Sequence, residues 1–175
     1  LLTPATATIP VDKAGGENRY GLCRAVRIDL SEEETRALLS GVHHVYDTEI
    51  NDLLLTALGR ALRRWHGSDT SLILLEGHGR EPLEEQIDVS RTVGWFTAIY
   101  PFRLEIHGEE IGRHIRQIKE DLRRLPHKAI GYGVLKYLAP ETAEDSVNFE
   151  CSPQIGFNYL GEFAAGDALN IFTLT

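Results

Sequence analysis

An apolar run that leads directly into a charged, glycine-rich turn constrains the fold of this chain most strongly. The run is Leu72-Ile73-Leu74-Leu75, and the turn is Glu76-Gly77-His78-Gly79-Arg80-Glu81. A short apolar run beside glycines predicts a buried strand. The two glycines predict a sharp backbone turn with room for a ligand close to the main chain. Four ionisable side chains at the end of a buried strand must be solvated, paired or used in chemistry. The pattern therefore indicates the edge of an active site, and an ordinary charged turn is the alternative.

Composition narrows the class of protein. With 175 residues, of which 42% are hydrophobic, the chain has the size and apolar content of about one domain. A net charge of −8 argues against a nucleic-acid partner, which needs a basic surface to neutralise phosphates. We expect no membrane association and a cytoplasmic location, because no apolar segment reaches spanning length and no signal peptide opens the chain. Cys23 and Cys151 are too few for a disulfide framework, and their state stays open.

Two helices are predicted in the first third of the chain. Ser31 can cap the first turn of one helix, with Glu34 completing a capping box. The second helix has Thr48 as its expected cap and Gly67 as its expected end, with Asp52 in a capping or solvated position. Its apolar stripe comprises Ile50, Leu53, Leu54, Ala57, Leu58, Ala61, Leu62 and Trp65.

The remaining elements alternate between strands and helices. We expect a linker or extended arm over 1–21, and a long amphipathic helix from Ile111 to Leu125 that ends at Pro126. A short helical element is expected over 131–138. Expected strands cover 22–30, 71–76, 92–106 with a break at Pro101, 155–160 and 170–175. This order predicts an α/β fold with a mixed sheet and packed helices.

Further segments accompany the turn at 76–81 in a fixed order along the chain. They are Asp52-Leu53-Leu54-Leu55-Thr56-Ala57-Leu58-Gly59, Arg91-Thr92-Val93-Gly94-Trp95-Phe96-Thr97, Tyr100-Pro101, Gly131-Tyr132-Gly133 and Gly156-Phe157-Asn158-Tyr159-Leu160-Gly161. From about Asn18 to Phe163, this set resembles the epimerization domains of nonribosomal peptide synthetases. Condensation domains share the fold and some of the spacing, but Glu-Gly-His-Gly-Arg and Val-Gly-Trp-Phe-Thr are the epimerization versions of these segments.

The resemblance implies a chloramphenicol-acetyltransferase-like lobe. In such domains two similar lobes form a V, and the reaction takes place in a tunnel between them. Residues 22–175 resemble the C-terminal lobe, so we expect the N-terminal lobe and the extreme C-terminus to be absent. The family's paired-histidine motif lies in the N-terminal lobe, and His43-His44 does not match it, because Asp47 comes one residue too early. We therefore expect the isolated lobe to be inactive.

The resemblance also implies a reaction, in which a carrier-bound aminoacyl or peptidyl thioester changes from the L to the D form by removal and return of its α-proton. This chemistry needs a positioned acid and base and a donor for the enolate oxygen. Glu76 is the first candidate for acid–base work. Desolvation in a tunnel would favour its protonated form, whereas pairing with Arg80 would favour the carboxylate, and the sequence leaves both open. Arg80 is a catalytic candidate that pairs with Glu76 or holds the turn.

The other site candidates follow from the matching motifs. Asn158 and Tyr159 interrupt an apolar strand, and they either bond to nearby backbone or support the substrate and its enolate. Tyr159 is the candidate proton donor on the face opposite Glu76. For substrate binding we name His78, whose alternative role is structural, and Trp95 and Phe96, which either pack in the core or line the tunnel for the phosphopantetheine arm.

Partners and cofactors are inferred in the same way. We expect no metal site and no directly bound cofactor, because the sequence contains no metal-ligand spacing, Walker loop or dinucleotide fingerprint. The substrate is expected on the 4'-phosphopantetheine of a peptidyl carrier protein, with neighbouring synthetase domains as further partners. A condensation lobe that forms peptide bonds and a noncatalytic carrier-docking lobe are the alternative functions. The amino acid, the oligomeric state and the choice between one-base and two-base proton transfer stay open.

Overall fold

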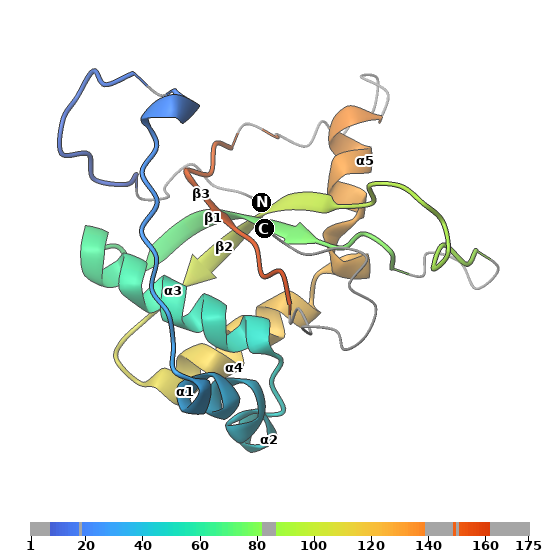
Figure 1. Cartoon of the computed structure of the whole chain (residues 1–175), viewed down its shortest axis with the longest axis horizontal. Helices are drawn as coiled ribbons and strands as arrows, with labels where there is room; N and C mark the ends of the chain where they lie inside the picture. The colour runs from blue at the N-terminus through green and yellow to red at the C-terminus, as the bar shows by residue number, and fades with distance from the viewer. Residues whose placement is uncertain (1–7, 18, 82–86, 139–148, 150, 162–175) are drawn as a thin grey trace, which may run out of the picture.

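A three-stranded mixed sheet forms the centre of the chain, and two long helices pack on one of its faces (Figure 1). The structure is a computed structural model that describes residues 8–17, 19–81, 87–138, 149 and 151–161. The strands are β1 (Thr70–Gly77), β2 (Ala98–Glu105) and β3 (Ile155–Phe157). The helical elements are η1 (Tyr20–Leu22), α1 (Glu32–Arg36), η2 (Ala37–Gly41), α2 (His43–Tyr46), α3 (Ile50–His66), α4 (Ile111–Arg123), η3 (Pro126–Ala129) and α5 (Gly131–Tyr137). The predicted α/β class with a mixed sheet is confirmed.

β1 lies in the middle of the sheet and pairs with both neighbours. It runs antiparallel to β2, with Ile73 opposite Phe102, and parallel to β3, with Ile73 opposite Ile155. The strand predicted over 71–76 is confirmed, and it is one residue longer at each end. Because β1 and β3 are parallel, their carboxyl ends meet at the same edge of the sheet.

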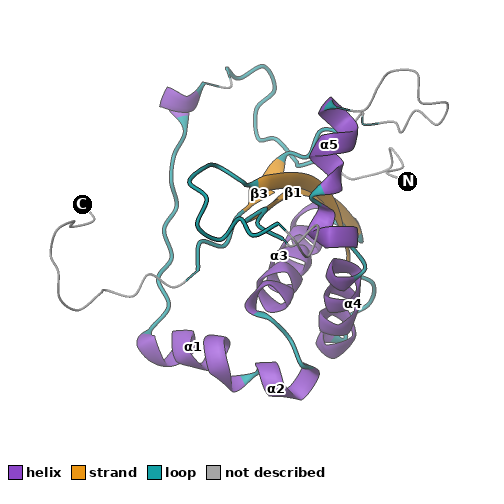
Figure 2. Cartoon of the chain, turned by 90° about the vertical axis from the view of Figure 1, so that its right-hand side faces the viewer, coloured by secondary structure: helices purple, strands orange, loops and turns teal. Residues whose placement is uncertain are grey.

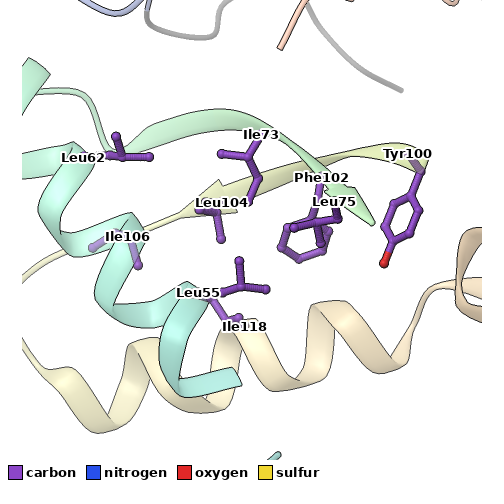
Figure 3. Close-up of a cluster of buried hydrophobic side chains, with 9 residues drawn as sticks. All are labelled: Leu55, Leu62, Ile73, Leu75, Tyr100, Phe102, Leu104, Ile106 and Ile118. Carbon is purple, nitrogen blue, oxygen red and sulfur yellow. The ribbon is translucent and has the colours of Figure 1, made fainter. Parts of the chain in front are cut away.

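The core lies between the sheet and the pair α3 and α4 (Figure 3). Every second residue of β1 and β2 points into it, as the period of a strand requires. Burying such apolar side chains provides the main driving force for folding. The fully buried members are Leu55 and Leu62 of α3, Ile73 and Leu75 of β1, Tyr100, Phe102 and Leu104 of β2, Ile106 after β2, and Ile118 of α4.

The buried face of α3 differs from the predicted stripe. The deepest residues include Leu55, Gly59 and Leu62, whereas Ala57 and Trp65 are exposed. Glycine at position 59 explains the rotation, because a Cβ there would approach Cγ1 of Ile106 to 2.9 Å. Because Gly59 has no side chain, α3 packs closely against Ile106 at this position. This contact, rather than the spacing of the apolar residues, decides which face of α3 is buried.

The helix caps agree with the prediction in two of three places. Ser31 caps α1, and Glu34 completes the capping box. Gly67 ends α3 in the left-handed region, as predicted. Thr48 is not the cap of α3, because Glu49 occupies that position and its N–H donates to Oδ2 of Asp52 across 2.8 Å. Of the two positions expected for Asp52, capping or solvated, the structure has the capping one, and the side chain of Asp52 is buried.

One strand prediction is wrong in the described residues, and two are too long. Residues 22–30 form no strand, because no other segment pairs with them in the described part of the chain. β2 begins at Ala98 rather than at residue 92, and it continues through Pro101 without a break. An edge strand tolerates proline, because the missing N–H can face away from the sheet. β3 ends at Phe157, three residues before the predicted end.

The remaining predictions concern the helices and the two termini. α4 ends at Arg123, shortly before Pro126, and α5 confirms the short helical element. Tyr132 of α5 packs against the core. The described residues of the expected arm are largely exposed, and its Ile9 N–H donates to Oε1 of Gln154. The strand expected over 170–175 lies outside the described residues.

Candidate active site at the ends of β1 and β3

Glu76 and Asn158 meet where the two parallel strands end. Glu76 is the penultimate residue of β1, and Asn158 directly follows β3. The amide Nδ2 of Asn158 donates to Oε2 of Glu76 across 2.7 Å. Asn158 and Tyr159 were expected to interrupt a strand, but they follow its last residue, and Asn158 bonds a side chain rather than nearby backbone. The parallel register thus brings together two residues that lie 82 positions apart.

A cavity of about 720 Å³ opens at this edge of the sheet. It is walled by the ends of β1 and β3, the start of the antiparallel β2, the start of α3, the end of α4 and the turn that follows α4. Five of the seven residues named from the sequence line this cavity: Glu76, His78, Trp95, Asn158 and Tyr159. The sequence therefore predicted a set of residues that the fold gathers around one space. Arg80 and Phe96 do not line it.

Glu76 is exposed in this structure, which contradicts the expectation of a partly desolvated carboxylate. Its side chain leaves the edge of the sheet rather than entering the core, because β1 alternates and Leu75 takes the inward position. Oε2 accepts the hydrogen bond from Asn158, and no cation pairs with Glu76 among the described residues. The carboxylate is thus oriented by an amide and accessible from the cavity.

The turn after β1 is shaped by Gly79. Its φ of +67° is in the left-handed region, and a Cβ there would lie 1.6 Å from the carbonyl oxygen of Phe96. Only glycine fits, so the expected sharp turn is present. The expected room for a ligand is not present at this glycine, because the chain's own backbone at Phe96 fills that space.

Arg80 holds the loop that precedes β2 and does not pair with Glu76. Its Nη1 donates to the carbonyl of Val89 at 2.5 Å, and Nη2 donates to the carbonyl of Gly94 at 3.3 Å. The guanidinium also lies over the Phe96 ring, 4.2 Å from its centre. Of the two roles left open by the sequence, the geometry matches the one that holds the turn. Phe96 accordingly packs under Arg80 instead of facing the cavity.

His78 is fixed in the turn by both ring nitrogens. Nδ1 accepts a hydrogen bond from the backbone N–H of Arg80 at 3.0 Å, and Nε2 lies 2.9 Å from Oε1 of Glu81. Glu81 also pairs with Nζ of Lys128 at 3.3 Å. This His78–Glu81–Lys128 group joins the glycine turn to η3 along the cavity. Histidine thus has a structural role here while its side chain also lines the cavity.

Sequence reasoning did not place several other polar residues at the cavity, among them Asp52, Arg123 and Tyr100. Asp52 of α3 is 2% exposed and pairs with Nη1 of Arg123 on α4 at 3.2 Å. This pair ties the ends of the two core helices together. Tyr100 lies at one end of the group of core side chains (Figure 3) and lines the cavity, and burial, followed by the nearby charge of Glu81, raises the pKa of Tyr100. No local pattern signals these contacts, because each joins elements distant in sequence.

Comparison with known proteins places this arrangement in a family. A family model described as Condensation domain matches residues 4–174. The chain belongs to the condensation domain family. It is 45% identical over 169 residues to surfactin synthase subunit 1 of Bacillus subtilis (strain 168). It is 46% identical over 157 residues to gramicidin S synthase 1 of Brevibacillus brevis.

A solved member of the condensation family has closely similar structure. The epimerization domain from the third module of tyrocidine synthetase B matches with a TM-score of 0.86 and 42% identity, over 93% of this chain and 36% of that one. The matched segment is 95% of this chain but 5% of surfactin synthase subunit 1, and 89% of this chain but 14% of gramicidin S synthase 1. The predicted recognition of a synthetase domain of this superfamily is confirmed.

Two further properties of this condensation-family chain concern membranes and metals. Among the described residues, no helix combines the length and the apolar character needed to span a bilayer. Within the same part of the chain, no group of three histidine, cysteine or acidic side chains is placed so that it could hold a metal ion.

Proposed function

We propose that this chain is part of an epimerization domain that inverts the α-carbon of a carrier-bound aminoacyl or peptidyl thioester. The observation that carries the proposal is the Glu76 carboxylate, oriented by Asn158 and open to a cavity that Tyr159 also lines. The cavity volume of about 720 Å³ lies in the range typical of small-molecule sites. The 42% identity to a solved epimerization domain supports this reaction class over others in the family.

In the proposed reaction, Glu76 is the base. Its carboxylate removes the α-proton, and the electron pair of the C–H bond moves into the thioester carbonyl to give an enolate. A hydroxyl on the opposite face returns a proton to the same carbon, and we assign this donor to Tyr159. The proton on Glu76 then passes to the phenolate through water, so that both groups regain their starting states. A positioned acid or base contributes roughly 10²–10⁴-fold to such a step.

Water must be excluded from the cavity by something other than the described residues. Glu76 and Asn158 are exposed here, and a carboxylate in water is a weak base toward a carbon acid. The motif resemblance assigns residues 22–175 to the C-terminal lobe. Because this chain corresponds to 36% of the similar epimerization domain, we expect the rest of such a domain to close over the cavity. Loss of water would strengthen the electrostatic interactions of Glu76 with the substrate.

We infer the route of the substrate from the residues of the loop that precedes β2. Trp95 is 91% exposed yet lines the cavity, so its ring is available as a wall for the 4'-phosphopantetheine arm of a peptidyl carrier protein. Arg80 fixes this loop through the carbonyls of Val89 and Gly94. We therefore assign Arg80 a positioning role, although its residue type also suited catalysis.

The decisive experiment is α-proton exchange measured in the complete domain. A carrier loaded with an aminoacyl or peptidyl thioester is incubated in deuterium oxide, and deuterium at the α-carbon is followed by mass spectrometry. Glu76→Gln is expected to reduce exchange by roughly 10²–10⁴-fold, because the amide keeps the shape and loses the base. Glu81→Gln is the matched control, since that carboxylate is already paired with His78 and Lys128 and should leave most exchange intact.

Other outcomes favour the alternative functions. Unchanged exchange in Glu76→Gln removes this residue from the mechanism. Dipeptide formation by the wild-type domain, with no α-proton exchange, indicates a condensation lobe. Carrier binding with neither reaction indicates a docking lobe.

A further inference from the structure

Within the strand predicted over 22–30, residues 23–30 form an extended segment that belongs to no sheet among the described residues. They run between η1 and α1, and Figure 2 shows the segment on the opposite side from α5, well away from the strands. Cys23, at the beginning of the segment, has φ −65° and ψ 143°, and Ser31, just after its end, has φ −64° and ψ 162°, both in the extended region. From residue 24 to 30, no backbone N–H or carbonyl bonds to another backbone group in the described part of the chain.

The two faces of this segment have different character. Nε of Arg27 lies 2.8 Å from Oδ1 of Asp29, as expected for residues two apart on one side of an extended chain. Val26 and Ile28 alternate with them, so they occupy the opposite side. They are 89% and 84% exposed, and Leu30 on the same side is also exposed. From Val26 to Leu30 the segment thus has the pattern of a half-buried strand, with an apolar face that is left exposed by the described residues.

An unpaired strand with a free apolar face is a template for another strand. The anchoring at its end supports this role, because the capping box of Ser31 and Glu34 fixes the segment to the start of α1. We propose that residues 22–30 become a β-strand by pairing with a strand in the part of the epimerization domain that this chain does not cover. Val26, Ile28 and Leu30 would then be buried against the other lobe, and Arg27 and Asp29 would stay in solvent.

The choice of partner follows from chain length and from charge. This chain corresponds to 36% of the similar solved domain, so most of such a domain is available as a partner within the same polypeptide. An intramolecular strand has a high effective concentration, which favours it over a second copy. The charged outer face, with Arg27 and Asp29 paired, suits a sheet that has one wet side. The inference rests on the proposed epimerization domain, but not on the role of Glu76.

Amide hydrogen exchange in the complete domain tests this inference. The amides of residues 24–30 are expected to exchange at least about 100-fold more slowly than in an unstructured peptide, because strand hydrogen bonds must open first. Exchange at the unstructured rate would overturn the proposal. So would protection that depends on protein concentration, which indicates a second copy, or protection that requires a loaded carrier.

Two variants of matched chemistry separate the faces. Ile28→Asp places a charge on the apolar face and is expected to abolish protection of the segment. Ala25→Asp places the same charge on the face of Arg27 and should leave protection unchanged. Equal protection in both variants contradicts the assignment of the faces, and if Ile28→Asp fails to fold, the wild-type protection still decides. Glu76→Gln should lose α-proton exchange while residues 24–30 stay protected, so failure of the two proposals can be told apart.

Discussion

Asn158 donates a hydrogen bond to Glu76 across 2.7 Å, and this contact joins the carboxyl ends of two parallel strands. Its length is that of a charge-assisted bond, so the amide orients the carboxylate as well as neutralising part of its field. The contact exists because β1 and β3 pair in register, with Leu75 opposite Phe157. Sheet topology therefore places a candidate base and its orienting group side by side.

Removing this amide should impair proton transfer without unfolding the domain. In Asn158→Ala, Glu76 keeps its charge but loses its orientation, and α-proton exchange is expected to fall about tenfold, the value of a hydrogen bond to a charged group. Asn158→Asp places a second carboxylate against the first, and repulsion should cost about a further tenfold. Exchange on a loaded carrier measures both. Equal activity of wild type and Asn158→Asp would falsify the orienting role.

The turn at Gly79 should tolerate no side chain. Gly79→Ala adds a Cβ 1.6 Å from the Phe96 carbonyl oxygen at a φ of +67°, so both steric overlap and backbone strain act. We expect a loss of about 3 kcal/mol in the free energy of unfolding of the complete domain, measured with urea. Gly67→Ala is the matched control, because its φ is +76° but nothing lies within 4 Å. It should cost about 1 kcal/mol from backbone strain alone. Equal losses at the two positions would show that the clash with Phe96 is relieved by movement of the loop.

Local patterns in the sequence correctly predicted the strands and helices that bury one face and leave the other face more exposed. The apolar run at 72–75 became β1, and the periodic residues of 111–125 became α4, because each period matches one buried face. Residues 22–30 have the alternation of a strand yet remain unpaired, because a strand needs a partner that local pattern does not specify. The face of α3 was predicted from the three- and four-residue spacing of its apolar residues, and the close approach of Ile106 to Gly59 shifted the buried face away from Ala57 and Trp65.

The candidate site was predictable as a set of residues but not as a set of contacts. Glu76 and Asn158 were chosen by motif, and their separation along the sequence concealed that they touch. Arg80 had two possible partners, and three-dimensional packing selected the carbonyls of Val89 and Gly94. The pair of Asp52 and Arg123 needed the packing of α3 on α4 before it could be recognised.

Strain in the backbone of η3 should be removable. His127 and Lys128 have φ values of 47° and 49°, a conformation that side chains with a Cβ disfavour. His127 is exposed, so His127→Gly removes the strain without opening a cavity. We expect an increase of about 0.5 kcal/mol in the free energy of unfolding, since relief of about 1–2 kcal/mol is partly offset by the greater flexibility of glycine.

A matched glycine substitution in a relaxed helix should act in the opposite direction. Ala57 is exposed in the interior of α3, and Ala57→Gly is expected to cost about 1 kcal/mol. Urea unfolding of the complete domain compares the two variants. A decrease in stability for His127→Gly similar to that of Ala57→Gly would show that η3 carries no strain.

Acid should selectively weaken the ion pairs at the start of β1. A hydrogen bond from Arg63 at 2.6 Å, followed by one from His107, lowers the pKa of Asp69 below its ordinary value of 3.8. As the pH falls, Asp69 is therefore protonated in the unfolded chain before it is protonated in the folded chain. The stability that Asp69 provides is present above pH 3.8 and is lost as the pH falls through its lower pKa in the folded chain. The difference in unfolding free energy between wild type and Asp69→Asn should be constant near neutral pH and shrink in that acidic window. Arg63→Gln removes the largest cause and should weaken the same pH dependence, whereas a difference that stays constant into strong acid contradicts the assignment.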